Sequence, residues 1–220
     1  MTNGSGAVAP DGSPVELYLK LPSFGEPEIV HAAIPPRASI LELGCGVGRM
    51  THELVRLGHP VTAVDESADM LSHVRDAEIV KSRIEDLDLE RRFDCVLLAS
   101  HFVNAADPDE RRRLLDVCRT HLAPDGRLLI ETYPADWHPV TGDVSGRDGV
   151  DFRILRADWE GPTVTAELEY RVGERHWRQG PFTATVLDLP ALRASLASAG
   201  LTFDRWLDER HTWLAARRLA

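Results

Sequence analysis

Three glycines stand at alternate positions directly after an apolar run, at Gly44, Gly46 and Gly48 in the stretch ILELGCGVGRM. Glycine permits a tight left-handed turn and lets a ligand approach the main chain. A turn that leads from a strand into a helix also leaves backbone N–H groups free to bind a ligand. The G-x-G-x-G spacing differs from the G-x-G-x-x-G of nicotinamide dinucleotide sites, which argues against a nicotinamide-dependent oxidoreductase. Glu42, just before the turn, would repel a pyrophosphate but suits a ligand that carries an ammonium group.

A second acidic residue points to a nucleoside ligand. Asp65 ends the apolar run VTAVD, about 20 residues beyond the glycines, where an acid of a βαβ unit binds ribose hydroxyls. The glycine turn and Asp65 lie in one such unit with the expected phasing. Together they predict a ligand that contains adenosine.

Two residues are candidates for a direct part in chemistry. His101 follows the apolar run FDCVLLA, and parallel-sheet folds place their ligands beyond the carboxyl ends of such strands. It is the best candidate for a general base, and a packing or helix-start histidine is the alternative. Tyr18, on a short amphipathic piece near the N-terminus, is a candidate lid over the ligand, with a simple core contact as the alternative.

Aromatic residues gather in a stretch rich in Gly, Pro and Asp that follows residue 132. Tyr133, Trp137 and His138 lie in its first part. Aromatic side chains are costly to leave exposed in a loop, and long loops in compact domains often serve function. These three residues are therefore predicted to form the wall of a substrate pocket.

The elements that must position these residues alternate along the chain. Runs typical of strands cover 39–43, 61–64, 78–81, 93–99 and 127–132, and helical patterns cover 47–57, 68–75 and 109–122. Such alternation predicts βαβ units, and continuously apolar strands predict a parallel sheet with helices on both faces. A turn is expected at 123–127. Beyond residue 132 we expect a long loop, an antiparallel β insertion, a last helix ending at Gly200 and two closing strands.

These patterns divide the chain as follows. The predicted divisions are a flexible tail (1–14) and a single domain (15–220) made of an N-terminal helical lid (15–37), a cofactor-binding core (38–132), a loop and antiparallel insertion over the acceptor site (133–187), and a last helix with a closing strand pair (188–220).

Composition limits the function classes. The chain has 220 residues and a formal net charge of −10, which argues against a surface that follows nucleic-acid phosphates. Its three cysteines are widely spaced, so we expect reduced thiols, no disulfide frame and no metal site. The N-terminus lacks the charged and apolar regions of a signal peptide, and no run approaches the roughly 20 apolar residues of a membrane span. A soluble cytoplasmic protein without a membrane or nucleic-acid partner is expected.

The motifs resemble those of a known family. ILELGCGVGR, VTAVDESADML, RIEDLDL, FDCVLLASHFVN and LAPDGRLLIET are similar, in order and spacing, to the successive motifs of class I (Rossmann-like) S-adenosylmethionine-dependent methyltransferases. The resemblance spans 34–132. It implies an α/β fold with a doubly wound, seven-stranded, mainly parallel sheet whose last strand is antiparallel. It also implies S-adenosylmethionine as cofactor and S-adenosylhomocysteine as product.

The resemblance assigns cofactor contacts residue by residue. The expected cofactor-binding residues are Glu42, Gly44, Cys45, Gly46 and Gly48 for the methionine part, Asp65, Glu66 and Met70 for ribose and adenine, Ile84 and Glu85 for adenine, and Ala99 and Ser100 beside the transferred methyl group. Arg83 stands where the family usually has an acid that pairs with the adenine amino group. Glu85 or Asp86 is left to supply that acceptor.

The expected function is methyl transfer to oxygen or nitrogen of a small-molecule acceptor, such as a secondary metabolite. The tetrad N-P-P-Y of many amino-methylating enzymes is absent, and the strand ends in ASHFVN instead. The alternative from another class is a non-catalytic S-adenosylmethionine-binding partner or sensor. C-methyl transfer and peptide N-methyl transfer rank behind these. The oligomeric state stays open.

Overall fold

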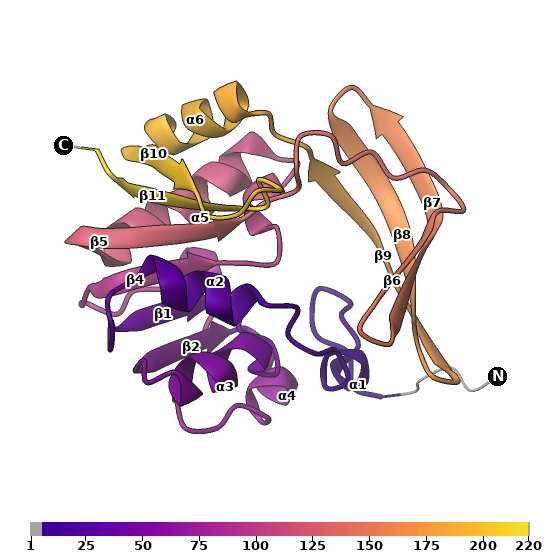
Figure 1. Cartoon of the computed structure of the whole chain (residues 1–220), viewed down its shortest axis with the longest axis horizontal. Coiled ribbons are helices and arrows are strands. Elements are labelled where there is room, and N and C mark those ends of the chain that lie inside the picture. Colours follow the sequence, from indigo (N-terminus) through magenta and orange to yellow (C-terminus); the bar gives the residue numbers. More distant parts are fainter. Residues whose placement is uncertain (1–5, 220) are drawn as a thin grey trace.

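The computed structural model describes residues 6–219 and contains two sheets. The larger sheet has seven strands in the order β10-β11-β5-β4-β1-β2-β3 (Figure 1). Its strands are β1 (Ile40–Leu43), β2 (Val61–Asp65), β3 (Glu78–Lys81), β4 (Phe93–Leu98), β5 (Leu122–Glu131), β10 (Leu201–Trp206) and β11 (Trp213–Arg218). Strand β11 runs antiparallel to both of its neighbours, and β1 to β5 pair in parallel. The predicted sheet is therefore confirmed.

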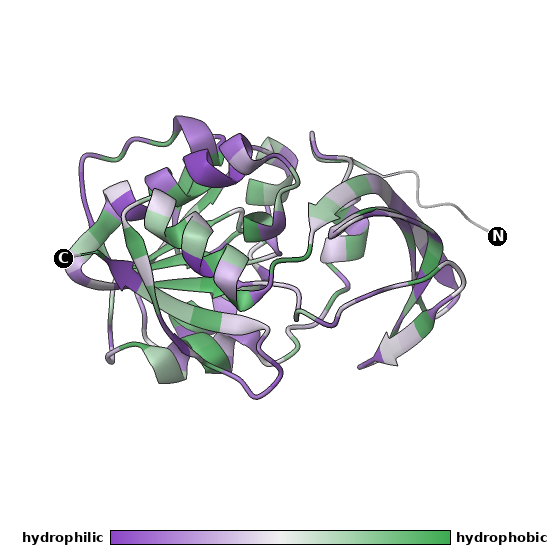
Figure 2. Ribbon diagram, turned by 90° about the horizontal axis from the view of Figure 1, so that it is seen from above, coloured by the Kyte–Doolittle hydropathy of each residue, from purple (hydrophilic) through white to green (hydrophobic). Residues whose placement is uncertain are grey.

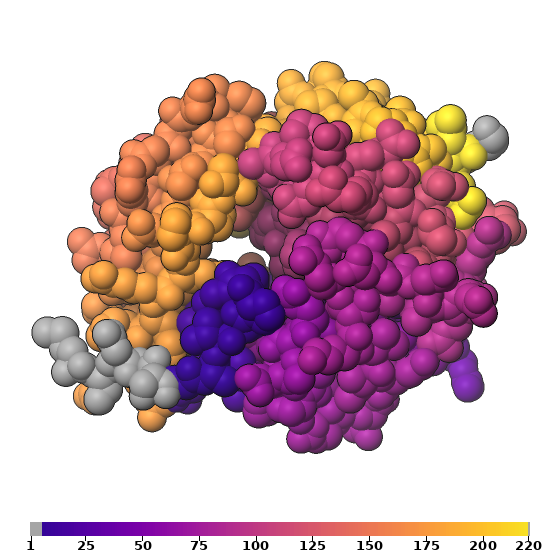
Figure 3. All heavy atoms as spheres, turned by 180° about the vertical axis from the view of Figure 1, so that it is seen from behind, coloured from indigo at the N-terminus to yellow at the C-terminus, as the bar shows by residue number. Residues whose placement is uncertain are grey.

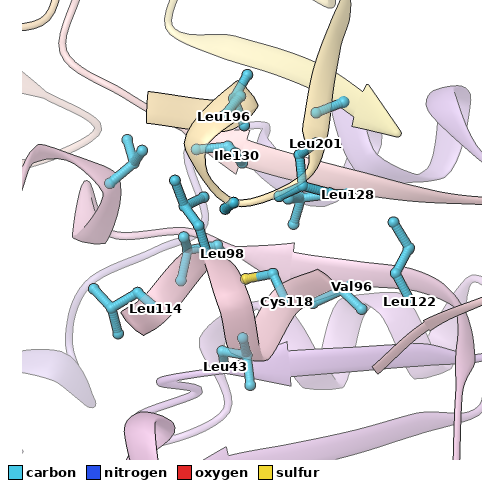
Figure 4. Close-up of a cluster of buried hydrophobic side chains, with 14 of the residues drawn as sticks. Leu43, Val96, Leu98, Leu114, Cys118, Leu122, Leu128, Ile130, Leu196 and Leu201 are labelled. Atoms are coloured by element: carbon cyan, nitrogen blue, oxygen red, sulfur yellow. The ribbon is translucent and has the colours of Figure 1, made fainter. Parts of the chain in front are cut away.

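Helices cover both faces of this sheet. They are α2 (Glu26–Ala33), α3 (Arg49–Arg56), α4 (Ala68–Leu71), α5 (Pro108–His121) and α6 (Leu189–Ser198). The short helix α1 (Val15–Tyr18) lies apart from these faces (Figure 1), and 3₁₀ turns occur at Ile84–Asp86 and Phe102–Asn104. Alternate residues of the strands point to opposite faces. Leu98 and Ile130 thus pack with Leu114 of α5 and Leu196 of α6 (Figure 4), and Leu97 packs with the α2 and α3 side. Burying each such leucine contributes about 1.5–3 kcal/mol to the stability of the sheet.

The smaller sheet confirms the predicted antiparallel insertion. Its four strands are β6 (Val144–Arg147), β7 (Val150–Glu160), β8 (Thr163–Val172) and β9 (Arg175–Thr185), in sequence order. It stands beside the larger sheet, with α1 between them (Figure 1). Apolar residues are concentrated in the central strands of the larger sheet, whereas along the smaller sheet apolar and polar residues alternate (Figure 2).

Three local predictions differ from the structure. The turn expected at 123–127 lies inside β5, where pairing jumps from Phe93–Leu122 to Cys95–Arg127 and leaves the residues between as a bulge. Helix α4 ends at Leu71, short of the expected 75, and the Ser72 hydroxyl donates to the Asp69 carbonyl just beyond that end. Strand β6 lies in the stretch expected to be a loop.

Part of the flexible tail expected over 1–14 contacts the rest of the protein, since Gln179 donates to the Ser13 hydroxyl. Residues 1–5 lie outside the described part of the chain. In residues 6–14, Ala9 and Ser13 are buried, and Val8 pairs with Pro14 in an isolated bridge. A Pro- and Gly-rich composition favours mobility only where no surface is available to pack against. Among the described residues, no helix is both long enough and apolar enough to span a bilayer.

Candidate active site

The glycine turn after β1 requires its glycines for two different reasons. Gly44, Gly46 and Gly48 have φ of 71°, 55° and 84°, in the left-handed region. A side chain at Gly44 would place its Cβ 2.5 Å from the Phe102 ring, whereas a Cβ at Gly46 would meet no atom within 4 Å. Gly44 is thus fixed by a close aromatic contact. Gly46 leaves open space beside the main chain, as a ligand lying on this turn would need.

Asp65 joins this turn to the next one. At the end of β2, its Oδ2 accepts from the Gly46 N–H at 2.9 Å and its Oδ1 accepts from the Ser67 N–H at 2.8 Å. A carboxylate oxygen can accept more than one hydrogen bond. Asp65 therefore holds the two turns together and still has lone pairs for a ligand.

A cavity of about 270 Å³ opens at this edge of the sheet. The residues expected at the site that line it are Tyr18, Gly44, Gly46, Asp65, Glu66, Met70, Ile84, Glu85 and Ser100. Lining residues that sequence reasoning did not assign to the site are Ala9, Asp11, Ser13, Ser82, Arg83, Phe102, Glu110 and Leu114. Glu110 and Leu114 are four residues apart on α5, a spacing that places them on one helix face.

The charge of the cavity suits a cationic ligand. Five carboxylates line it, from Asp11, Asp65, Glu66, Glu85 and Glu110. Arg83 is the only guanidinium among the described lining residues, and it pairs with Glu85 at 3.3 Å. S-adenosylmethionine, with a sulfonium, an ammonium and one carboxylate, carries a net positive charge, so the residues present fit it.

Four expected cofactor residues lie outside the cavity lining. Cys45 packs its side chain with Ala63, Leu71 and Val74, and burial raises the pKa of its thiol above the ordinary value, so the thiol is not a nucleophile. Gly48 precedes the first turn of α3, and Ala99 is buried. The fourth is Glu42.

Glu42 is a buried acid beneath the glycine turn. It is only 4% exposed, and the Thr51 hydroxyl donates to its Oε2 at 2.6 Å. Burial raises the pKa of Glu42 from 4.5 to about 7, an effect that the Thr51 hydrogen bond and the charge of Arg49 only partly oppose. The carboxyl is therefore half protonated near neutral pH.

This raised pKa predicts a pH-dependent stability. The folded state binds the proton more tightly than the unfolded state, so the stabilisation is present at low pH and is lost as pH rises through about 7. The loss from this group should be about 3 kcal/mol between pH 4.5 and pH 7. Glu42→Gln has no such proton to lose, and it should unfold at higher urea concentration than the natural protein at about pH 8 but not at about pH 5.

The matched control is Glu28→Gln, an exposed position of α2. It should keep the natural pH dependence. Equal pH dependence for the natural protein and Glu42→Gln would show that Glu42 has an ordinary pKa.

His101 lies directly beside the cavity, between Ser100 and Phe102, which both line it. Ser100 and His101 have φ of 54° and 62°, two successive left-handed residues that are not glycine. Such strain persists only where neighbours hold it. Glu131, at the end of β5, stabilises this backbone conformation. Its Oε2 accepts from the Ser100 N–H at 2.7 Å and lies 3.8 Å from His101 Nδ1. Sequence reasoning missed Glu131, which is an ordinary strand residue by pattern.

The protonation of His101 follows from its surroundings. Burial lowers the pKa of His101, and the carboxylates of Glu131 and Glu26 oppose that effect only in part. The imidazole is therefore neutral at pH 7 and can accept a proton.

The expected pocket-wall aromatics form a stack that starts at His101. The Tyr133 ring lies 3.9 Å from His101, and Trp137 stacks on Tyr133 at 3.8 Å. His138 stacks on Trp159 of β7 at 4.1 Å. Trp137 and His138 line a second cavity of about 420 Å³, between the 135–138 loop, the β7–β8 turn and the start of α6. Of the three predicted residues, only Tyr133 thus touches His101, and Trp137 and His138 face a different cavity.

These features define a class of protein before any comparison. At the carboxyl ends of β1, β2 and β4, the doubly wound sheet carries three features around a cavity rich in carboxylates. They are the glycine turn, the carboxylate of Asp65 and the imidazole of His101. The position of this cavity, at the carboxyl ends of parallel strands, and its carboxylates suit a cationic nucleoside ligand.

Comparisons with known proteins give the family. Residues 40–126 match the family described as a methyltransferase domain. The chain is 34% identical over 177 residues to the cypemycin N-terminal methyltransferase of a Streptomyces species, covering 74% of this chain and 69% of the relative. It is 28% identical over 154 residues to the dTDP-3-amino-3,6-dideoxy-alpha-D-glucopyranose N,N-dimethyltransferase of Streptomyces fradiae. That alignment covers 66% of this chain and 60% of the relative.

A solved structure has the same fold over the whole chain. The sugar N-methyltransferase KedS8 from Streptoalloteichus sp ATCC 53650 aligns with a TM-score of 0.74 and 24% identity, covering 100% of this chain and 99% of that one. The chain belongs to the S-adenosylmethionine-dependent methyltransferases with the class I, Rossmann-like fold. It is an enzyme that uses S-adenosylmethionine as methyl donor.

Proposed function

We propose that this enzyme methylates an amine nitrogen of a small-molecule acceptor. The observation that carries the proposal is His101, a neutral imidazole beside the cofactor cavity with the carboxylates of Glu131 and Glu26 near it. An aliphatic amine has a pKa of about 8–10 and arrives protonated, so it must lose a proton before its lone pair can attack. In this proposal the carboxylates of Glu131 and Glu26 attract the protonated amine, and the His101 imidazole then accepts its proton. The names of the N,N-dimethyltransferase and the sugar N-methyltransferase above, which specify nitrogen, support the same choice.

The residues of the cavity have separate roles in this proposal. Asp65 accepts hydrogen bonds from the ribose hydroxyls, Met70 and Ile84 hold the adenine, and the Gly44–Gly46 turn holds the methionine part. Bound S-adenosylmethionine supplies the activated methyl group. In this proposal the protein contributes alignment, supported by the contact of the Tyr133 ring with His101 and by Tyr18, which lines the cavity. We also place the enzyme in the cytoplasm, since Cys45, Cys95 and Cys118 are all free thiols.

A matched pair of acceptors tests the choice of atom. The enzyme is incubated with S-adenosylmethionine and either 4-phenylbutylamine or 4-phenylbutanol, which differ only in the reacting group. We expect S-adenosylhomocysteine and the N-methylated amine in equal amounts, and no product from the alcohol. Methylation of the alcohol alone would replace nitrogen with oxygen. Tight S-adenosylhomocysteine binding without turnover on a broad panel of amines and alcohols would favour the sensor alternative.

A further inference from the structure

One face of the smaller sheet is almost entirely apolar. Register pairs place rows of side chains side by side on it: Phe152–Tyr170–Trp177, Ile154–Leu168–Gln179, Ala157–Ala166–Phe182 and Trp159–Val164–Ala184. We call these twelve residues the inward face. Gln179 is its one non-aromatic polar side chain, and its Nε2 already lies 3.3 Å from Ser13 Oγ and 3.4 Å from the Tyr18 hydroxyl.

The inward face looks toward the proposed reaction centre. Val164 and Ala166 pack against Tyr133 and Trp137, and Gln179 contacts Tyr18, which lines the cofactor cavity. The space-filling view shows an opening between the smaller sheet, the N-terminal residues and the core (Figure 3).

Part of the inward face is left uncovered by the protein itself. Five of its large side chains stay half-buried: Phe152, Ile154, Leu168, Tyr170 and Phe182. These side chains form an apolar wall that reaches from Tyr18 and Tyr133 toward solvent. Apolar area of this kind, next to a reaction centre, is typical of a ligand site.

Several cations of this sheet lie on its other face. Pairing of Arg153 with Glu169, and of Arg171 with Asp151 and His176, places these side chains on the opposite, outward face. Arg147 and Arg175 lie at the rim, in the next row on the same side as the inward face, where register pairs join Arg147 to Val150 and Arg175 to Val172. Both are engaged there, because Arg175 pairs with Glu16 and Arg147 donates to the Phe24 carbonyl. Within residues 6–219, the inward face as defined offers no lysine or arginine to a diphosphate, which proteins bind with such groups.

We infer that the acceptor is an amine with an uncharged apolar body, aromatic or alkyl, which lies on the inward face, and that it is not linked to a nucleoside diphosphate. This inference rests on the proposed amine methylation. It adds that the body of the acceptor is recognised by Phe152, Ile154, Leu168 and Phe182 through burial of apolar area. Affinity therefore depends on the length of that body.

Calorimetry tests how amine affinity depends on the length of the apolar body, without any methyl transfer. The complex with S-adenosylhomocysteine is titrated with butylamine, hexylamine, octylamine and 4-phenylbutylamine, and separately with thymidine diphosphate. Each methylene buried should improve affinity about fourfold, so octylamine should bind far more tightly than butylamine. 4-Phenylbutylamine should also bind more tightly than butylamine, and thymidine diphosphate should bind more weakly than octylamine. Affinity that does not rise with chain length, or tighter binding of thymidine diphosphate, would overturn the inference.

A pair of variants locates the contact. Leu168→Glu puts a carboxylate on the inward face and should weaken octylamine binding at least tenfold, because the buried alkyl chain would meet a charge. Thr165→Glu puts the same charge on the outward face of the same strand and should leave the affinity within twofold. Unchanged S-adenosylhomocysteine affinity shows that each variant is folded. Should Leu168→Glu fail that check, Ile154→Ala takes its place, with an expected several-fold loss.

These experiments distinguish failure of the inward-face site from failure of the proposed amine methylation. Amines that bind with rising affinity but are never methylated would contradict the proposed methylation and leave the apolar site standing. Equal loss in Leu168→Glu and Thr165→Glu would place the amines elsewhere and refute the inward-face site.

Discussion

His101→Ala is expected to lower kcat for an amine acceptor about 10²–10⁴-fold, with S-adenosylhomocysteine affinity nearly unchanged. His101 would act on the acceptor's proton, and its side chain is not part of the cofactor cavity lining. Because burial lowers the pKa of His101, the natural enzyme should keep its activity down to mildly acidic pH and lose it only as the imidazole becomes protonated. The measurement is a pH–rate profile at saturating cofactor, with a mass spectrum of the methylated product.

The control for that variant is His176→Ala, which removes an imidazole from the outward face of β9. It should leave kcat within twofold. A loss in His101→Ala that rising pH fully repairs would mean that the amine deprotonates without help and that positioning provides the remaining acceleration. A loss below tenfold across the whole pH range would remove His101 from the role of base.

The second large effect is expected at Asp65. Asp65→Ala should weaken S-adenosylhomocysteine binding about a hundredfold or more. Hydrogen bonds to a charged group contribute about 1.5–3 kcal/mol each, and the variant loses those to ribose along with the carboxylate that holds Gly46 and Ser67. Asp65→Asn should have a smaller effect, since one amide oxygen still accepts. Isothermal titration calorimetry measures both.

Asp69→Ala is the matched control, because Asp69 is an exposed carboxylate on α4, four residues further along the chain. Its cofactor affinity should equal that of the natural protein. An unchanged affinity in a folded Asp65→Ala protein would take Asp65 out of the proposed site.

The sequence predicted those parts of the molecule whose causes are local. The glycine turn, the strand before it and Asp65 at the end of the next strand are encoded within one βαβ unit, so spacing alone places them at one sheet edge. The alternation of apolar runs likewise predicted the parallel sheet, and the period-two pattern after residue 150 predicted the antiparallel one.

Other features depend on contacts between distant parts of the chain, and no local pattern signals these. Trp137, predicted as part of a substrate-pocket wall, stacks on Tyr133, packs against Trp159 of β7 and lines the second cavity. Glu131 looks like any strand residue until β4 and β5 pair and bring it to Ser100. Asp11 and Ser13 lie in a Gly- and Pro-rich stretch whose composition suggests a free tail, yet they line the cofactor cavity because a partner surface on β9 is present.

The N-terminal residues form a wall that the cofactor cavity shares with the proposed acceptor site. Tyr18 lines the cofactor cavity, its hydroxyl contacts Gln179 of the inward face, and Glu16 pairs with Arg175 at the tip of β9. If one ligand orders the N-terminal segment when it binds, the segment is already ordered when the second ligand binds. The two binding equilibria are then linked by a single coupling free energy. Such linkage is reciprocal, so the factor by which cofactor improves acceptor binding must equal the factor by which acceptor improves cofactor binding.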